Sequence, residues 1–217
     1  MVMSGDKTGP AALAPTGLRE RKKQLTCKAV SDAAIGIFLE RGFGKVSVAE
    51  VAAAADMSKP TLFRYFPAKE DLVLHRYAEH EDEAARVVSA RASGESPLAA
   101  LRRHHLDGLD RRDPVTGLCD TPAVLAFHRL LYGTPSLVAR LHAYRGRSEK
   151  ALARALGNGM PARLAAGQIV AVLRILAEGN WRRIDAGESA GQVYGGAVAA
   201  AENAFVQLRT GLEQVSR

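Results

Sequence analysis

Helical periodicity runs along almost the whole chain. Apolar residues recur at spacings of three and four, and Gly or Pro interrupts the pattern at short intervals. This period is typical of helices that bury one face, and no segment alternates between apolar and polar residues as a half-buried strand does. The sequence therefore predicts an all-α fold of about nine helices. They are expected at residues 18–41, 47–55, 59–66, 69–91, 98–111, 122–132, 136–156, 161–183 and 188–212.

Charge is unevenly distributed over the 217 residues, whose formal net charge is +7. Residues 18–69 contain ten Lys or Arg against five Asp or Glu, whereas residues 70–217 contain nineteen against seventeen. A local basic surplus fits a polyanionic partner such as nucleic acid. The N-terminal quarter is therefore the part expected to meet such a partner.

Other bulk features limit the alternatives. No apolar run approaches the length of a membrane span, and residues 1–17 lack the basic and apolar blocks of a signal peptide. We therefore expect a cytoplasmic protein without a membrane partner. Residues 1–17, rich in Gly, Pro, Ala and Thr, are expected to form a disordered tail. Cys27 and Cys119 form neither a disulfide framework nor a zinc-binding spacing, so no metal and no cofactor are expected.

The most informative stretch is residues 47–66. Ser47 followed by Glu50 is a capping box that starts one helix. Asp56 begins a tight break, because Asp tolerates left-handed backbone better than most residues other than Gly. Ser58 then caps a second short helix. The spacing predicts a helix, a turn and a helix.

The two short helices divide their side chains between two faces. The inner, apolar face consists of Val51, Ala52, Met57, Leu62 and Phe66. The remaining faces carry Lys59, Thr61, Arg64 and Tyr65. Lys and Arg pair with phosphates or with guanine edges, and Thr bonds a base or packs on a thymine methyl. This division suits a helix that lies in the major groove and is braced by the helix before it.

These residues carry a family resemblance. The stretch Val46–Leu72, preceded by Ala33-Ala34, Phe38 and Glu40 to Phe43, resembles the DNA-binding signature of the tetracycline-repressor (TetR) family. The resemblance covers about residues 18–77, a quarter of the chain. It implies a DNA-binding domain at 18–77, with its helix-turn-helix at 47–66, and a helical ligand-sensing and dimerisation domain at 78–217.

The resemblance also implies roles for single residues. The implied DNA contacts are Ser47, Ser58, Lys59, Pro60, Thr61, Phe63, Arg64, Tyr65 and Lys69, with further backbone contacts from Arg21, Lys22 and Lys23. Ser47, Tyr65 and Lys69 would bind phosphates, while the side chains at 59–61 and 64 would face bases or nearby backbone. The chain departs from the family at Asp56, where Gly is usual, and at Phe63, where the usual Tyr hydroxyl is missing.

The second half is expected to hold a pocket and a dimer interface. The pocket candidates are His105, Phe127, His128, Leu131, Tyr132, His142 and Tyr144. The interface candidates, on the last helix, are Val193, Tyr194, Gly195, Val198, Phe205 and Leu208. Each set has a plainer interpretation as core or surface side chains of a single chain.

The implied function is a dimeric repressor that binds a palindromic operator in double-stranded DNA and is released by an unidentified small-molecule ligand. An activator, or a regulator without a ligand, would carry the same residues. An enzyme is disfavoured, because the sequence contains no nucleophile elbow, phosphate loop, HExxH motif or paired-carboxylate arrangement.

Overall fold

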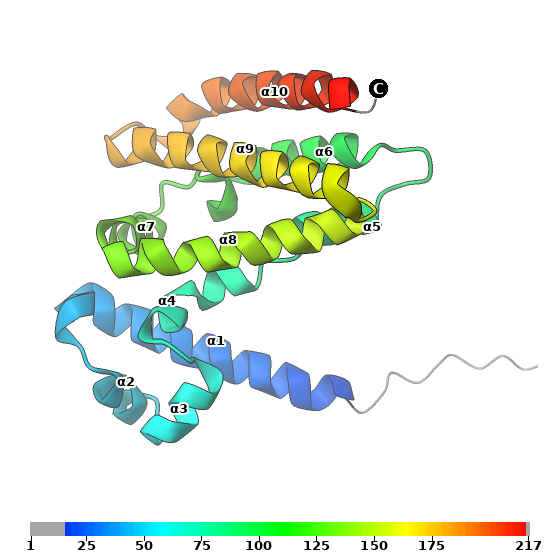
Figure 1. Cartoon of the computed structure of the whole chain (residues 1–217). Helices are drawn as coiled ribbons and strands as arrows, with labels where there is room; N and C mark the ends of the chain where they lie inside the picture. The colour runs from blue at the N-terminus through cyan, green and yellow to red at the C-terminus, as the bar shows by residue number, and fades with distance from the viewer. Residues whose placement is uncertain (1–15, 216–217) are drawn as a thin grey trace, which may run out of the picture.

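The computed structural model describes residues 16–215, and within that range the regular structure is entirely helical (Figure 1). The elements are α1 (Thr16–Arg41), η1 (Phe43–Lys45), α2 (Val48–Ala54), α3 (Lys59–Tyr65), α4 (Lys69–Ala78), α5 (Glu83–Ser89), α6 (Pro97–Asp110), η2 (Pro114–Thr116), α7 (Pro122–Gly133), α8 (Pro135–Ala155), α9 (Gly159–Asp185) and α10 (Ala190–Val215). The all-α prediction is confirmed. The tail expected at 1–17 lies outside the described residues up to position 15, and α1 begins at Thr16.

The described range contains ten α-helices where about nine were expected, because the helix expected at 69–91 is divided in two. The division falls at residues 79–82, which contain neither Gly nor Pro. Turn hydrogen bonds, such as His80 N–H to Tyr77 O at 3.1 Å, replace the helical ladder there. Tertiary contacts of Glu83, described below, hold the break in place, and a local sequence pattern does not encode such contacts.

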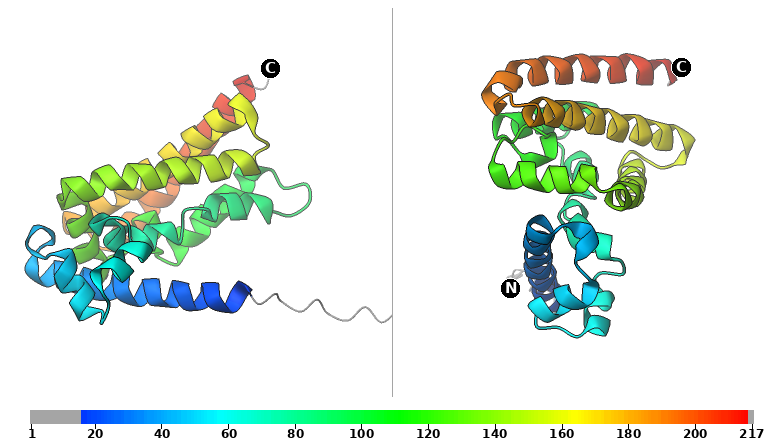
Figure 2. Two further views of the ribbon diagram at one scale, coloured as in Figure 1. Left: turned by 60° about the horizontal axis from the view of Figure 1, so that its bottom comes forward. Right: turned by 90° about the vertical axis from the view of Figure 1, so that its left-hand side faces the viewer.

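The helices form a small N-terminal head and a larger body (Figure 2). In the head, α1 packs against α2 and α4, and α3 packs against α2. In the body, α8 packs against α5 and α9, and α10 packs against α6 and α9. The helix α4 also packs on α8, so it joins the two parts.

One apolar core joins the head to the body. Phe38 of α1, Leu62 of α3 and Leu74 of α4 belong to the same buried cluster as Leu131 of α7 and Leu141 of α8. Each of these side chains is at most 2% exposed. Two further clusters fill the body between α5, α6, α8, α9 and α10. The head is therefore fixed to α7 and α8 by packing rather than by a linker.

By length and composition alone, α9 would be able to cross a membrane, although a single helix of this kind is weak evidence of a membrane protein. In the structure it packs between α8 and α10. Arg174 and Glu178, one turn apart on this helix, form an ion pair with an N–O distance of 3.0 Å.

The short helix η2 lies against α9. Asn180 Nδ2 donates to Thr116 O at 3.0 Å. Gly117 follows with φ of 73°, and a Cβ at this position would lie 2.0 Å from Ala177 O. Only Gly allows both the left-handed backbone and the close approach. This contact fixes the loop that borders the cavities described below.

Replacing Gly117 by Ala is expected to lower the free energy of unfolding by about 3 kcal/mol or more, from the backbone clash and the strained φ together. Gly167→Ala is the matched control, because a Cβ at Gly167 on α9 meets nothing within 4 Å. The control should raise stability by about 0.5–1 kcal/mol, as Ala is the better helix former. Urea unfolding measures both, and equal stabilities would contradict the argument.

Candidate functional site

The turn between α2 and α3 is built by the caps that the sequence predicts. Ser47 Oγ accepts the Glu50 N–H at 3.2 Å, and Glu50 Oε2 accepts the Ser47 N–H at 2.7 Å. Asp56 has φ of 51°, so the left-handed break is confirmed. Ser58 Oγ accepts the Thr61 N–H at 3.2 Å and starts α3. These bonds fix α3 relative to α2 before any partner binds.

A second contact secures the start of α2. Arg41 Nη2 donates to Glu50 Oε1 at 2.5 Å. The Ser47 N–H, followed by the Arg41 guanidinium, lowers the pKa of Glu50 to about 2. Glu50 is therefore ionised at neutral pH and remains paired with Arg41, one of the basic side chains of the head. Ser47, which we expect to bind a phosphate, keeps its N–H and one oxygen lone pair within the capping box.

The two faces of α3 differ as expected. Leu62 and Phe66 are buried, at 1% and 3% exposure. The outer face exposes Lys59, Pro60, Phe63 and Arg64, while Thr61 and Tyr65 are half-buried. The Lys59 Nζ lies 5.9 Å from the centre of the Phe63 ring, and the Arg64 Cζ lies 5.8 Å from the centre of the Tyr65 ring. These cations rest on aromatic rings and remain exposed to a partner.

Lys69 at the start of α4 is placed differently from the other basic residues of the head. Its ammonium donates to Phe43 O and lies 4.3 Å from the centre of the Phe43 ring. Burial lowers the pKa of Lys69. The side chain thus ties α4 to η1, and its expected grip on a phosphate stays a prediction that requires it to leave or share this contact. Arg21, Lys22 and Lys23 lie exposed on α1.

A buried carboxylate connects the head to α8. Asp71 is 5% exposed. Its oxygens accept Arg140 Nε at 2.9 Å, Arg140 Nη2 at 2.8 Å, the Tyr144 hydroxyl at 3.1 Å and the Ala68 N–H at 3.0 Å. Burial, together with the Asp71 charge, raises the pKa of Tyr144 to about 12, so its hydroxyl stays protonated and donates. The first turn of α4 is therefore bound directly to α8.

Tyr144 also borders a cavity of about 170 Å³ inside the body. Three of the pocket candidates line it, namely His128, Tyr132 and Tyr144. The sequence reasoning missed Tyr77 of α4, His80 of the turn after α4, Arg145 of α8, and Arg174 and Trp181 of α9. Of the other candidates, Phe127 and Leu131 belong to the core, and His142 is exposed on α8.

A second cavity of about 170 Å³ adjoins the first and shares His80, Val115, Ser148 and Leu173 with it. It contains the remaining candidate, His105. The first cavity lies between α4, α7, α8, α9 and the η2 loop, and the second lies between α5, α6, α8, α9 and the same loop.

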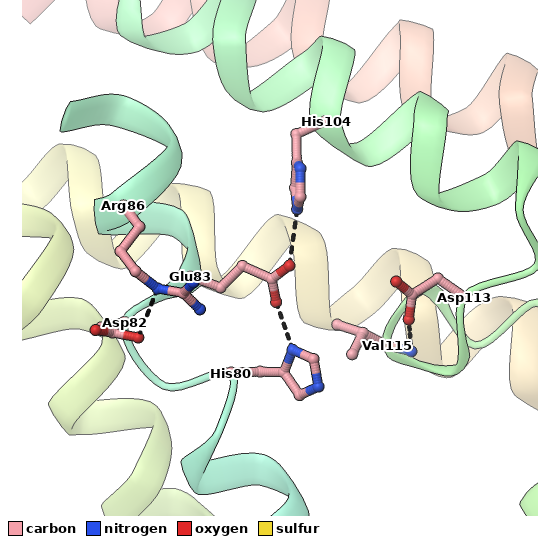
Figure 3. A network of polar contacts seen from close by, with 7 residues as sticks. All are labelled: His80, Asp82, Glu83, Arg86, His104, Asp113 and Val115. Carbon is pink, nitrogen blue, oxygen red and sulfur yellow. Dashed lines mark hydrogen bonds and ion pairs between the residues drawn. The ribbon is translucent and has the colours of Figure 1, made fainter. Parts of the chain in front are cut away.

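A polar network borders the second cavity (Figure 3). Glu83 reaches between two imidazoles, His80 Nδ1 at 2.7 Å and His104 Nε2 at 2.9 Å. The bonds from His104 and His80 hold the pKa of Glu83 well below its usual range, and Glu83 raises the pKa of His80. In the described part of the chain, no group of three or more His, Cys, Asp or Glu is arranged to hold a metal.

The predicted interface residues divide between the inside and the outside of the chain. Val193, Phe205 and Leu208 are 0%, 3% and 6% exposed and pack in the body's own core, and Val198 packs against it. Only Tyr194 and Gly195 are exposed. Apolar size along α10 identified the face that fills the core, because a helical stripe does not tell which surface covers it. Large exposed apolar side chains lie instead at Met160, Leu164 and Ile175 on α9 and at Tyr194 and Val206 on α10.

The family model of the bacterial regulatory proteins of the tetR family matches residues 30–75, which include all of α2 and α3. This segment belongs to the tetR family. It therefore carries the helix-turn-helix domain of a family of DNA-binding transcriptional regulators.

Individual relatives agree with this assignment. The chain is 31% identical over 135 residues to the HTH-type transcriptional regulator TcmR of Streptomyces glaucescens, covering 62% of this chain and 58% of TcmR. It is 31% identical over 93 residues to RutR of Escherichia coli K12, covering 43% of this chain and 44% of RutR. The matches thus span less than two thirds of either relative.

Solved structures share the fold. NalD, the secondary repressor of the MexAB-OprM multidrug efflux pump in Pseudomonas aeruginosa, superposes with a TM-score of 0.54 at 18% identity, covering 83% of this chain and 97% of NalD. The SmeT–triclosan complex superposes with a TM-score of 0.54 at 14% identity, covering 86% of this chain and 91% of SmeT. The likeness extends over head and body and concerns the fold alone.

The buried histidines predict how stability depends on pH. Burial lowers the pKa of both His105 and His128 to about 4, from an ordinary value of 6.5. As pH falls below 6.5, the unfolded chain takes up these protons before the folded chain does, so stability is full above 6.5 and is lost toward pH 4. The raised pKa of His80 has the opposite effect, because it adds to the stability of the folded chain as pH falls.

Between pH 7 and pH 5 we therefore expect the free energy of unfolding to fall by about 3 kcal/mol. Urea unfolding at the two pH values and one protein concentration measures it. The double variant His105→Phe, His128→Phe should lose most of this dependence. His142→Phe, at an exposed position, should keep it. Equal stability of the native chain at pH 5 and pH 7 would refute the assignment.

Proposed function

We propose that the protein is a sequence-specific transcriptional regulator that places α3 in the major groove of DNA. The observation that carries this proposal is the outer face of α3, where Lys59, Thr61 and Arg64 surround a helix held from below by Leu62 and Phe66. Major-groove recognition needs such donors on a braced helix. The caps at Ser47 and Ser58 favour it further, because they fix α3 before it meets DNA. The protein would act in the cytoplasm, on double-stranded DNA.

We further propose a homodimer formed through α9 and α10. Met160, Leu164 and Ile175 are 50–61% exposed, and Val206 on α10 is 49% exposed. These two helices pack against each other. A second copy would remove them from water, and two heads would read two halves of a palindromic operator. Tyr194 and Gly195 remain candidates for this interface, whereas the buried Val193, Phe205 and Leu208 support it from within.

We propose that a small molecule in the two adjoining cavities releases the repressor from its operator. The support is the position of α4. Its first turn holds Asp71, bound to α8, its last turn places Tyr77 at the first cavity, and the turn that follows places His80 at both cavities. A ligand that displaces the end of α4 or Tyr144 acts on the same helix that follows α3, so it changes the spacing of the two heads. The repressor named NalD shares this fold, which favours repression over activation.

Selection of bound duplexes from a random DNA pool should enrich a palindrome bound at least about a hundredfold above random sequence. Arg64→Ala should weaken binding to the selected site by about ten- to a hundredfold and reduce the preference at one base position, if Arg64 reads a guanine edge. Arg154→Ala, an exposed arginine of α8, is the matched control and should bind as the native chain does. An equal loss on every sequence would instead make Arg64 a phosphate contact, and no enrichment would contradict sequence-specific binding.

Ile175→Lys is expected to raise the dimer dissociation constant about a hundredfold, because the interface would bury an unpaired ammonium. Ile175 is 57% exposed on α9, and Leu25, 60% exposed on α1, offers a control of equal exposure. Leu25→Lys should leave the dimer intact. Sedimentation equilibrium of both variants measures the difference. A monomeric native chain, or equal dissociation of the two variants, would exclude this interface.

A further inference from the structure

The wall of the first cavity is aromatic. The rings of Tyr132 and Trp181 have centres 4.6 Å apart at an interplanar angle of 33°. His128 stands 6.1 Å from Trp181 at 87° and 6.0 Å from Tyr132 at 57°. All three rings line the cavity, as does Tyr144 of α8. Aromatic faces in stacked and edge-on orientations offer a flat molecule favourable contacts on several sides.

Buried nitrogens without partners belong to side chains that line the same cavities. Within residues 16–215, His128 Nδ1 and Trp181 Nε1 in the first cavity and His105 Nε2 in the second are buried and make no hydrogen bond. His128 is 5% exposed and His105 is 8% exposed. A buried polar group normally has a partner, and leaving it without one costs stability. Three such groups around two joined cavities indicate positions at which a ligand supplies the missing partner.

The chemistry of these groups restricts the ligand. The Trp181 indole only donates, so its partner must be an acceptor such as a carbonyl or phenolic oxygen. Burial keeps His105 and His128 neutral at physiological pH, and a neutral imidazole pairs with hydroxyl or carbonyl groups.

The charges at the cavity disfavour a cation. Arg145 and Arg174 each contact Glu178 at 3.0 Å, which leaves one net positive charge beside the first cavity. A neutral or singly anionic molecule suits this balance in the first cavity, where a cation would meet a like charge and no carboxylate belongs to the described lining. The carboxylate of Asp113 lines the second cavity and accepts the Val115 N–H at 3.0 Å.

The size of the two cavities sets the number of rings in the ligand. Each cavity is about 170 Å³, and a cavity of about 150 Å³ takes one benzene ring. The two cavities meet at Val115 and Leu173, which line both. A molecule that reaches from Trp181 to His105 therefore needs two or three rings.

We propose that the joined cavities bind a planar aromatic molecule of two or three rings with hydroxyl or carbonyl oxygens at its edges, neutral or singly anionic. Trp181, His128 and His105 hydrogen-bond these oxygens, and Tyr132 with Trp181 stacks on the rings. This inference rests on the proposed ligand-responsive function and specifies the chemical class of its ligand.

The single tryptophan of the chain makes the test direct. Trp181 fluorescence, corrected for probe absorption, is titrated in the absence of DNA with chrysin and 1-hydroxyanthraquinone, and calorimetry repeats each titration. Dodecanoate serves as the aliphatic acid and proflavine as the planar cation. We expect dissociation constants below about 100 µM for at least one planar oxygenated probe and weaker binding of the other two classes. Preferential binding of dodecanoate or proflavine, or no binding of either planar oxygenated probe, would overturn the proposal.

Variants separate recognition from structural support. Trp181→Phe and His128→Phe keep an aromatic ring and remove the unpartnered nitrogen. Each should weaken binding of the planar probe about fivefold by calorimetry, with Tm unchanged or raised, since no native hydrogen bond is lost. His142→Phe, at an exposed position on α8, is the control and should bind as the native chain does. Unchanged affinity in both cavity variants, or a Tm loss of more than about 5 °C beside the lost affinity, would assign these rings a structural role instead.

Probe binding and DNA binding, measured separately, distinguish the proposed ligand class from the proposed regulatory function on which it rests. Probe binding without any DNA binding would overturn the proposed regulator and leave the ligand class standing. Selective DNA binding by a chain that binds neither planar oxygenated probe would overturn the ligand class and leave the proposed regulator standing.

Discussion

The structure depends most on one buried carboxylate, Asp71, three residues into the first turn of α4. Burying an ion is costly. The cost is offset here by a bidentate contact from Arg140, by the Tyr144 hydroxyl and by the Ala68 N–H. Both side-chain partners come from α8, about seventy residues later in the chain. Asp71 therefore sets the position of α4, and with it the orientation of α3, relative to the body. Loss of either partner would leave the other contacts to hold a charge in an apolar core.

The same junction explains why head and body form one mechanical unit. The apolar cluster around Phe38 and Leu74 continues into α7 and α8, and Ser31 Oγ on α1 donates to Leu72 O at 2.6 Å. A domain boundary at residues 77 and 78, as the resemblance implies, would fall at the end of α4, beside Tyr77, which packs on this cluster. Rotation of α4 must then carry the rest of the head with it.

Local chemistry in the sequence was sufficient for the helix-turn-helix, whose caps at Ser47 and Ser58 and left-handed Asp56 depend on neighbours within a few positions. Local chemistry was insufficient where contacts between distant residues determine the structure. The α4–α5 break is held by Glu83 and His104, which lie 21 positions apart. Trp181 joins the cavity from α9 at a register that only packing reveals, although His128 and Tyr132 were found from their residue types. On α10, Val193, Phe205 and Leu208 fill the core of the same chain while Tyr194 is exposed, because periodicity alone does not tell which surface covers an apolar stripe.

In this arrangement, the affinity for the ligand and the release of DNA by the ligand depend on different residues. A ligand shifts an equilibrium only by the difference in its affinity for the two states, and reversing a 99 to 1 ratio takes about 5.5 kcal/mol, or about 2.7 kcal/mol from each protomer of the proposed dimer. Hydrogen bonds to Trp181 and His128, on α9 and α7, hold the ligand in both states and contribute affinity. Contacts to Tyr77 and His80 change when α4 moves, because Tyr77 lines the first cavity from α4 itself and His80 lies in the turn directly after it. Two or three such contacts at about 1 kcal/mol each supply the required difference. The side chains of α4 at the cavity therefore determine whether a bound molecule releases the DNA, and the aromatic wall determines which molecules bind.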